Sequence, residues 1–474
     1  MTRWILICCV FTSLHATAQN AGSNRLTLKQ CVATAVNNNL QVKQAEFLNE
    51  AAEVNASHAR HNLLPDLFGN LGHGLNQGRS IDPFSNAYLN QQVKFANAGI
   101  NSSVTVFNGG QLLNNVKQTR LVNEANKMEV QQTKESITLS VILAYLQILN
   151  NQDLVEQARN QASVTRNQVE RLNVLNKAGA VTPALFYDLR GQLANDELAI
   201  VNSQNQLNTA RLTLAQLMNV PYDPQLTVEP LSANELTARY VADPNQIFEN
   251  ASTQLSIIKG VEFRRQAAEQ SVRVAKGFKF PVVSFSTGLN TNYSNAARTE
   301  SVVSVVDQPS GDFVNINGSK VPVFTQSRIT TQQPIGYFNQ FTNNYSTSFF
   351  LNLSIPILNG FRARNRVSLA RIDVKNAAFV EQTTKTQLSQ AVEQAYFNMN
   401  AAVERYNTLT RQVDDFAESF RIAEVRFNAG AITQVDYLIA KNNVDRSRIN
   451  LIIAKYDYAF RAKILDYYKG QLEL

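Results

Sequence analysis

Few residues in this chain have the types and spacing that chemistry requires. His58 and His61 lie three positions apart in a stretch whose apolar spacing predicts a helix, so the two imidazoles can share one face and one metal ion. No third ligand is apparent nearby, so we interpret the two histidines as a surface pair. The chain shows no glycine-rich phosphate loop leading from a strand into a helix and no recognisable nucleophile–base pair. The sequence therefore predicts no enzyme, no cofactor and no bound metal.

A small glycine turn occurs twice. Residues 178–182 read AGAVT and residues 429–433 read AGAIT, 251 positions apart. The glycine of each turn can take the left-handed conformation that ends a helix. The residues that can start the following helix are Thr182 with Pro183, and Thr433 with Asp436. Each turn is therefore predicted to be the tip of a long helical hairpin.

The two turns belong to an internal repeat. FNGG at 107–110 matches LNGF at 358–361 with the same offset of 251 residues. Upstream, Pro65 in NLLPDLFG matches Pro281 in FKFPVVSF with an offset of 216 residues. The second copy therefore holds 35 extra residues, which we interpret as an enlarged polar loop at 294–340.

Both copies follow the same order of elements. A helix of about 35 residues leads to a proline, where the pattern changes to strands that alternate apolar and polar residues. A helical run of nearly 70 residues follows, and its apolar residues are spaced as in a coiled coil, which needs a partner helix. The predicted divisions are a signal peptide at 1–18, a first repeat at 19–218, a linker at 219–243 and a second repeat at 244–474. The predicted strands cover about 65–77, 98–107, 281–293 and 345–357, and the predicted helical hairpins cover about 109–218 and 361–470.

The N-terminus has the features of a secretory signal peptide. MTRWILICCVFTSLHATA combines an early arginine, a short apolar segment and small residues before an expected cleavage after Ala18. Cleavage would leave Cys31 as the one cysteine, which we expect to be a small apolar residue on a helix and not a reactive thiol. The formal net charge of +7 comes from scattered Lys and Arg, which argues against nucleic-acid binding.

Two strands in each copy make four per chain, which is too few to close a membrane barrel, since the smallest have about eight. If these strands lie in a membrane, several chains must share one barrel. Two chains would supply eight strands and three would supply twelve, and the periodicity does not choose between them.

The chain resembles the TolC-like outer-membrane efflux proteins over essentially the whole mature sequence. The resemblance rests on LTLKQCVATAVNNN and its weaker copy, PDLF and FPVV, FNGG and LNGF, and AGAVT and AGAIT, in that order. It implies a mainly α-helical homotrimer with a 12-stranded outer-membrane β-barrel that continues into a periplasmic coiled-coil tunnel. It implies a passive exit duct for efflux or type I secretion in a Gram-negative bacterium. The partners implied are a periplasmic membrane-fusion adaptor, an inner-membrane pump of the RND or ABC type and outer-membrane lipid.

The resemblance also implies roles for residues at the hairpin tips. The positions that meet the adaptor are Gly179, Ala180, Val181, Thr182, Gly430, Ala431, Ile432 and Thr433. Asp436 matches the first of two acidic positions that constrict the pore, where three symmetric carboxylates would favour bound cations, although Asp436 can equally cap its helix. The second acidic position is Ile439 here, which would make the constriction less acidic and more apolar. Asp188 in the first hairpin is a further candidate for the pore lining.

Four arginines crowd the start of the long helix that follows the last strand, namely Arg362, Arg364, Arg366 and Arg371. Their counterparts in the first copy are mostly neutral, namely Gln111, Leu113, Asn115 and Arg120. Positive charge at a helix N-terminus opposes the helix dipole. A solvated face, ion pairs with neighbouring subunits and phospholipid headgroups are the explanations that the sequence leaves open.

One structural rival to the duct is an exported coiled-coil scaffold or adhesin whose strands form a soluble sandwich. The other rival is an enzyme with its active site among the strands, for which the sequence offers no candidate residues.

Overall fold

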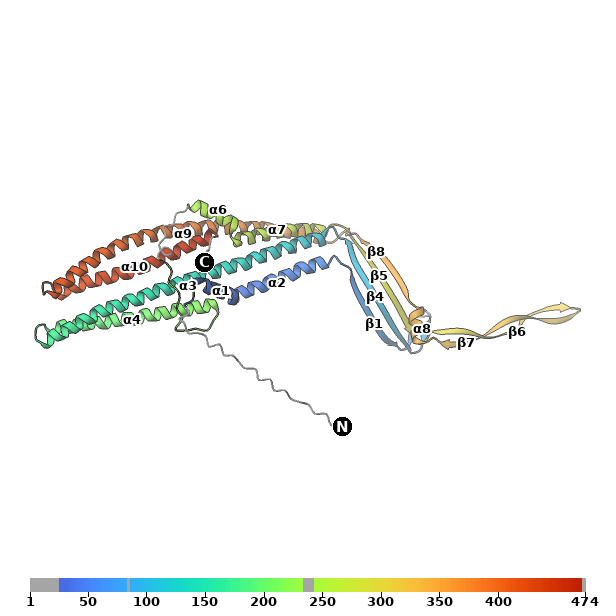
Figure 1. The fold of residues 1–474 in the computed structure, drawn as a ribbon. Helices are drawn as coiled ribbons and strands as arrows, with labels where there is room; N and C mark the ends of the chain where they lie inside the picture. The colour runs from blue at the N-terminus through green and yellow to red at the C-terminus, as the bar shows by residue number, and fades with distance from the viewer. Residues whose placement is uncertain (1–24, 83–85, 233–242, 471–474) are drawn as a thin grey trace, which may run out of the picture. The chain divides into compact units, whose positions relative to one another are not determined.

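The computed structural model describes residues 25–82, 86–232 and 243–470, which are mainly helical with a smaller part in strands (Figure 1). The predicted signal peptide and residues 233–242 of the predicted linker lie outside the described residues. The chain divides into two compact units. Unit 1 comprises the described parts of Met1–Glu50, Glu124–Phe263 and Phe379–Leu474, and unit 2 comprises those of Ala51–Asn123 and Arg264–Ala378.

The first helical segment is divided into two helices, α1 (Leu28–Asn38) and α2 (Leu40–His61), so the prediction of one helix of about 35 residues is wrong. Asn39 between them is extended, with ψ of 131°, and its Oδ1 accepts a hydrogen bond from the backbone N–H of Gln41 at 2.8 Å. An asparagine that caps the next helix in this way ends one helix and starts another. Hydrophobic spacing does not reveal a break of one residue.

The second copy has the same division. Here α6 (Pro244–Gln254) and α7 (Ser256–Gly277) are separated by Leu255, which is also extended, with ψ of 134°. Asp243 caps α6 by accepting a hydrogen bond from the N–H of Asn245. The bounds of α6 and α7 are those of α1 and α2 shifted by 216 residues.

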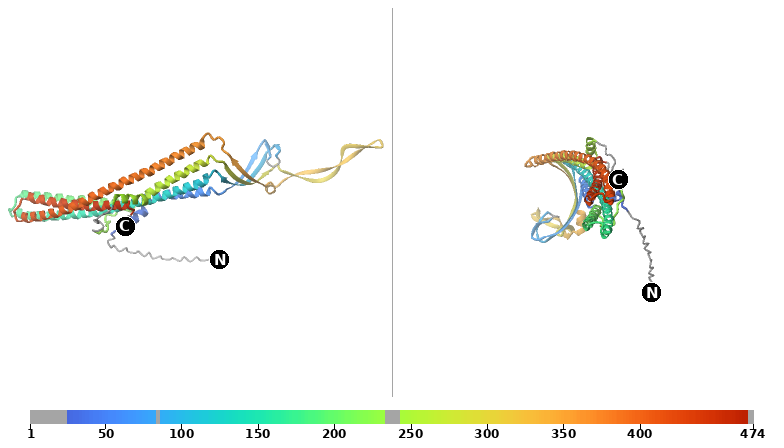
Figure 2. Two further views of the ribbon diagram at one scale, coloured as in Figure 1. Left: turned by 90° about the horizontal axis from the view of Figure 1, so that it is seen from above. Right: turned by 90° about the vertical axis from the view of Figure 1, so that its left-hand side faces the viewer.

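Unit 2 contains an antiparallel four-stranded sheet in the order β1-β4-β5-β8. Its strands are β1 (Asp66–Asn76), β4 (Val93–Phe107), β5 (Val282–Ser294) and β8 (Ser346–Ser354). They run side by side in a curved sheet (Figures 1 and 2). β2 (Arg79–Ile81) and β3 (Tyr88–Asn90) form a short separate ladder. Strands from both copies of the sequence therefore lie in one sheet.

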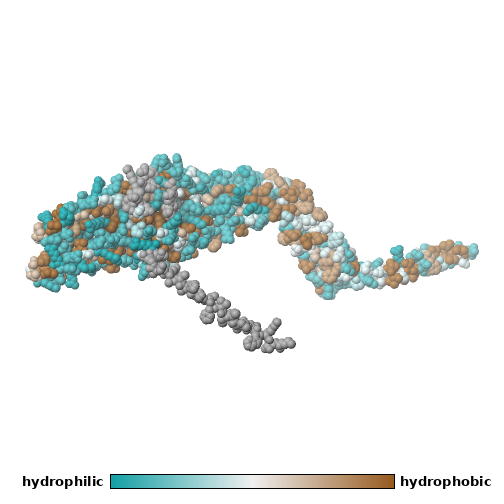
Figure 3. All heavy atoms as spheres, viewed as in Figure 1, coloured by the Kyte–Doolittle hydropathy of each residue, from teal (hydrophilic) through white to brown (hydrophobic). Residues whose placement is uncertain are grey.

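The segment predicted as an enlarged loop at 294–340 is instead mainly a β-ribbon, so that prediction is wrong. β6 (Arg298–Ile316) pairs with β7 (Ser319–Pro334), and a short helix, α8 (Tyr337–Asn343), follows. Asn317 and Gly318 have φ of 52° and 84°, as a tight hairpin turn requires. Many hydrophobic residues of the ribbon are exposed (Figure 3). Its Ser, Asn and Gly content favoured a loop, although the segment also contains many β-branched residues, which favour strands.

The two longest helices, α3 (Gln111–Lys177) and α9 (Arg362–Asn428), have 67 residues each and differ in position by 251. Each turns back at its tip into a shorter helix, α4 (Pro183–Met218) or α10 (Gln434–Tyr468). A 67-residue helix is roughly 100 Å long. None of the described helices has an apolar stretch long enough to cross a membrane.

The hydrophobic core of unit 1 consists of two clusters. The first joins α1, α3, α4 and α10 and includes Cys31, Val141, Tyr145 and Leu214. The hydroxyl of Tyr145 lies 2.6 Å from the carbonyl oxygen of Glu229 and 3.1 Å from that of Leu26. The second cluster joins α6, α7, α9 and α10, with Ile247, Ile258, Val392, Met399 and Leu465 at its centre.

Candidate functional site

Both hairpin tips are built on a glycine in the left-handed region. Gly179 has φ of 66° and Gly430 has φ of 74°, which confirms the predicted helix ends. The N–H of Ala180 donates to the carbonyl of Leu175, and the N–H of Ala431 donates to that of Arg426. Such bonds satisfy the last carbonyls of a helix and require a residue that tolerates positive φ. No atom lies within 4 Å of where a Cβ would stand on either glycine.

The return helices start differently at the two tips. Thr433 and Asp436 form a reciprocal capping box at the start of α10, in which the N–H of Asp436 donates to Thr433 Oγ1 at 3.2 Å. The Thr433 hydroxyl in turn lies 2.7 Å from Asp436 Oδ2. Thr182 makes no side-chain capping bond, and α4 instead begins with Pro183. The capping interpretation of Asp436 is therefore confirmed, and its carboxylate is engaged at the tip.

The candidate pore residues lie on exposed helix faces. Asp436 and Ile439 are exposed and lie three residues apart on α10, opposite the face that buries Gln434, Tyr437 and Lys441. Asp188 is exposed on α4. Ile439 and Asp188 are thereby open to a lumen or a partner, whereas the exposed Asp436 carboxylate also holds the capping box with Thr433.

Direct contacts join the two tips. Gln434 of α10 donates to the carbonyl of Leu185 in α4 at 3.2 Å, and Arg171 of α3 donates to the carbonyl of Asn428 in α9 at 2.9 Å. Within the second hairpin, Tyr437 packs its ring between Phe420 and Phe427. The structure thus brings the two AGA turns, far apart in the sequence, into one surface.

A buried charged cluster in the two hairpins, formed by Lys441, Asp445, Asp196 and Thr165, was not predicted from the sequence. Lys441 Nζ lies 2.7 Å from Asp445 Oδ2 and 3.3 Å from Asp196 Oδ2, and the Lys441 side chain is only 1% exposed. Thr165 donates a short hydrogen bond to Asp196 Oδ2, and Gln192 donates to Asp196 Oδ1 at 2.9 Å. Burial raises the pKa of the Asp445 carboxyl, and the attraction of Lys441 opposes that rise.

One sequence signal could have revealed this cluster. Gln434, Tyr437, Lys441, Val444 and Asp445 follow the helical spacing of a buried stripe, and all five are buried. A lysine in such a stripe with an aspartate four residues later is typical of an internal ion pair. The partner on the other hairpin, Asp196, could not have been identified without the fold.

The sheet in unit 2 has two chemically different faces. Strand alternation and the pairing register place nine exposed apolar side chains on one face, namely Leu67, Leu71, Leu75, Ile100, Phe285, Leu289, Phe349, Leu351 and Leu353. The other face is mostly polar, with Asn70, Asn101, Ser103, Ser286, Asn290, Ser348 and Asn352, and with Phe68, Val93, Phe95 and Phe350 as exceptions. On it, Asn101 donates to Asn70 across the strands at 3.0 Å.

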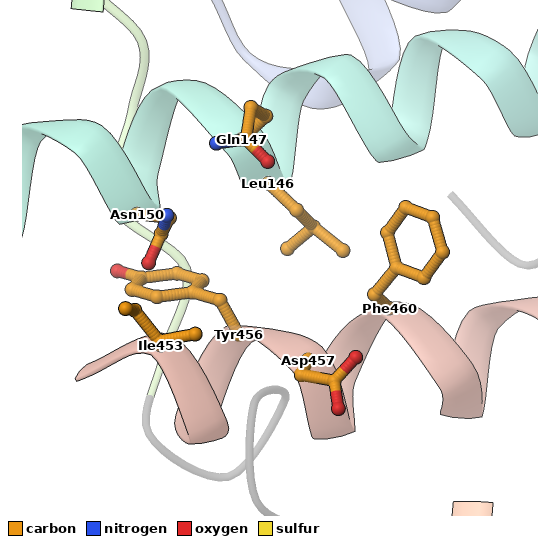
Figure 4. A pocket seen from close by; sticks show the side chains of 7 residues that line it. All are labelled: Leu146, Gln147, Asn150, Ile453, Tyr456, Asp457 and Phe460. Carbon is orange, nitrogen blue, oxygen red and sulfur yellow. The ribbon is translucent and has the colours of Figure 1, made fainter. Parts of the chain in front are cut away.

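The other described parts of the chain do not resemble a catalytic or metal site. In the described part of the chain, no group of three or more His, Cys, Asp or Glu residues could hold a metal ion. His58 and His61 are both exposed near the end of α2. A cavity of about 260 Å³ lies between Leu146 of α3 and Phe460 of α10, but its lining is largely apolar and amide side chains (Figure 4).

Comparison with known proteins gives a consistent result. A family model described as outer membrane efflux protein matches residues 31–220 and 257–466. The toxin and drug export protein A of Aggregatibacter actinomycetemcomitans is 21% identical over 453 residues, which cover 91% of this chain and 83% of that protein. The outer membrane protein TolC of Vibrio cholerae is 19% identical over 424 residues, covering 90% of this chain and 86% of TolC.

The fold also resembles solved structures. The outer membrane protein VceC of Vibrio cholerae superposes with a TM-score of 0.74 at 16% identity, over 94% of this chain and 96% of VceC. The MtrE outer membrane channel of Neisseria gonorrhoeae, solved in its open state, gives a TM-score of 0.72 at 14% identity, over 94% of this chain and 89% of MtrE. The likeness therefore extends over both units of the fold.

Proposed function

The chain belongs to the outer membrane efflux protein family and serves as an outer-membrane exit duct for efflux, and we propose that three copies assemble to form that duct. In this proposal the twelve strands of three sheets close one barrel in the outer membrane of a Gram-negative bacterium. The helical hairpins continue the barrel as a coiled-coil tunnel in the periplasm. The signal peptide is proposed to be removed after Ala18.

The two-faced sheet is the observation that carries this proposal. A sheet with exposed leucines and phenylalanines on one face and asparagines and serines on the other suits a wall between lipid and a wet interior. Among the described strands, β1 and β8 are each paired on one side only, so backbone groups along both edges have no strand partner within the chain. A lipid environment requires those groups to be paired, which a neighbouring copy on each edge would achieve.

The tips provide the proposed contact with the export machinery. Gly179, Gly430 and most of their neighbours in the two turns are exposed, with Val181 and Ile432 half-buried, and hydrogen bonds join the two tips, which supports docking of a periplasmic membrane-fusion adaptor. An inner-membrane pump of the RND or ABC type would supply the energy. Asp436, Ile439 and Asp188 are proposed to line the constriction, with Ile439 making it partly apolar.

The duct is proposed to conduct passively, without catalysis and without a cofactor. Its relatives and fold neighbours are channel and export proteins. The family match gives no support to the rival interpretation of an exported scaffold or adhesin.

Reconstitution of the mature protein tests the proposal. Light scattering in detergent should give the mass of three chains, and planar bilayers should show stepwise ionic conductance. Replacing Leu351 and Leu353 by Asp on the apolar face should abolish bilayer insertion, whereas Ser348→Asp on the polar face should permit insertion and change the conductance. A stable monomer or a wild-type protein without conductance would contradict the proposal.

A further inference from the structure

Four helices have one end in unit 2, and those ends attach to the same end of the sheet. The register pairs Asp66 with Ser103 and Val282 with Ser354, so β1 and β5 begin where β4 and β8 end. α2 and α7 lead into this end, and α3 and α9 leave from it. The end of α2, the start of α3, the end of α7 and the start of α9 therefore all lie at one end of the sheet, although they are far apart in the sequence.

The chain carries an unbalanced positive charge at this end. Residues 54–65, 103–123, 270–281 and 355–372 contain no Asp or Glu. They contain ten exposed Lys or Arg residues, which we call the basic collar: Arg60, Lys117, Arg120, Arg273, Lys276, Lys279, Arg362, Arg364, Arg366 and Arg371. None of the ten forms a salt bridge within the described residues. The adjoining carboxylate of Asp66 accepts a hydrogen bond from the N–H of Ser103 at 2.6 Å.

The start of α9 is the densest part of the basic collar. Its four arginines lie in the first three turns, where the helix dipole disfavours positive charge. At the equivalent start of α3, the residues Gln111, Leu113 and Asn115 are neutral, so the fold itself does not need the charge. Arg362 donates to the carbonyl of Asn359 at 3.1 Å, but none of the four arginines has a carboxylate partner within the described residues, and such an unfavourable charge pattern indicates an external anion.

Two of these arginines lie beside aromatic and apolar surface. Arg362 and Arg366 line a groove of about 320 Å³ together with Phe278, Phe280 and Pro356. The Arg366 guanidinium carbon lies 4.1 Å from the centre of the Phe278 ring. Three further exposed apolar residues in the connection from β8 to α9 are Ile357, Leu358 and Phe361. Guanidinium groups next to exposed apolar side chains match a ligand that has both an anionic head and an acyl tail.

We propose that the basic collar, with Arg362 and Arg366 at its centre, binds the phosphate headgroups of anionic phospholipids. This inference rests on the proposed function, which places the end of the sheet at the membrane surface. Ion pairs with a neighbouring copy do not account for ten cations, because the four segments of an identical subunit also contain no Asp or Glu and its adjoining Asp66 already accepts the N–H of Ser103. Headgroup phosphates supply the missing negative charge and fix the depth of the barrel in the bilayer.

Native mass spectrometry of the mature protein in non-ionic detergent tests this inference. The protein is titrated with phosphatidylglycerol, with phosphatidylcholine and with inorganic phosphate. The test variant is Arg362→Gln with Arg366→Gln, and the matched control is Arg159→Gln with Arg411→Gln, two exposed arginines of unit 1 that also remove two positive charges. Each basic residue near an anionic surface contributes about fivefold in affinity. We therefore expect the test variant to bind phosphatidylglycerol about 25-fold more weakly, with the control unchanged.

Three results would overturn the inference: equal phosphatidylglycerol binding by the test and control variants, no preference of the wild type for phosphatidylglycerol over phosphatidylcholine, or inorganic phosphate bound as tightly as the lipid. Oligomer mass and conductance are measured on the same preparations. If the wild type lacked conductance, the proposed function would fail whatever the lipid result. If trimers and conductance were normal but the lipid preference were absent, the basic collar alone would lose its assigned role.

Discussion

Lys441 Nζ lies 3.3 Å from Asp196 Oδ2, although 245 positions separate the two residues in the chain. The same ammonium group lies 2.7 Å from Asp445 Oδ2, and Thr165 donates to Asp196. One buried cation therefore links α10 to α4, and the threonine adds α3. Because α4 belongs to the first hairpin and α10 to the second, this cluster couples the two hairpins inside unit 1.

Lys441→Met is expected to destabilise the packing of the hairpins severely. The variant would leave the carboxylates of Asp196 and Asp445 buried without their cation, and breaking a buried ion pair in this way costs about 3–5 kcal/mol. Hydrogen exchange of amides in α4 and α10 measures the loss. Lys455→Met is the matched control, because Lys455 pairs with Asp153 at a partly exposed site where about 1 kcal/mol or less is expected. Equal losses in the two variants would contradict the role of burial.

The pH dependence of stability should change in Asp445→Asn. Burial raises the pKa of Asp445 above its ordinary value of 3.8, so the folded state keeps this proton at higher pH than the unfolded state does. The contribution of Asp445 to stability therefore falls as pH rises from 3.8 through the raised value. Asparagine cannot ionise, so thermal unfolding of the variant should lose less stability over that range than the wild type. An equal pH slope in Asp445→Asn and in the wild type would refute the assignment.

Cys31 is expected to resist alkylation in the folded protein. Its side chain has no exposed surface, and burial raises the pKa of the thiol to about 11, so thiolate is scarce at neutral pH. Peptide mapping after iodoacetamide treatment should find residue 31 unmodified in native protein and fully modified in denaturant. Cys31→Ala should fold with a modest loss of stability, since it leaves a small gap in the first core cluster. Rapid modification of native protein would show that α1 opens readily.

The helical tips could be predicted because local chemistry determines them. A glycine that ends one helix and a threonine that begins the next act within a few residues, and Gly179, Gly430 and Thr433 have the expected conformations. The predicted family is confirmed for a related reason, since several such short motifs keep their order along the chain. Thr182 differs because Pro183 starts its helix without a side-chain bond.

The sequence did not reveal features in which opposite local preferences compete, or in which residues far apart in the chain come into contact. The breaks at Asn39 and Leu255 each change one residue and leave the hydrophobic spacing almost intact. The β6–β7 ribbon contains β-branched residues that favour strands within a polar composition that is typical of loops, so the two sequence indications were opposite. Asp196 meets Lys441 only after two hairpins pack together, and no local pattern contains that contact.

Replacing both tip glycines by leucine, Gly179→Leu with Gly430→Leu, is expected to leave trimers intact and to abolish export. Open space surrounds both positions, so the folding cost is confined to the left-handed backbone, about 1–2 kcal/mol at each site. The new side chains would project from the surface on which the adaptor is proposed to dock. Gly191→Leu on α4 is the control, because it also meets open space but lies within a regular helix. Light scattering reports the trimer, and drug accumulation in cells that hold the cognate adaptor and pump reports export. Normal export by the double variant would exclude the tips as the adaptor contact, whereas loss of the trimer in that variant alone would show that the turns contribute to assembly.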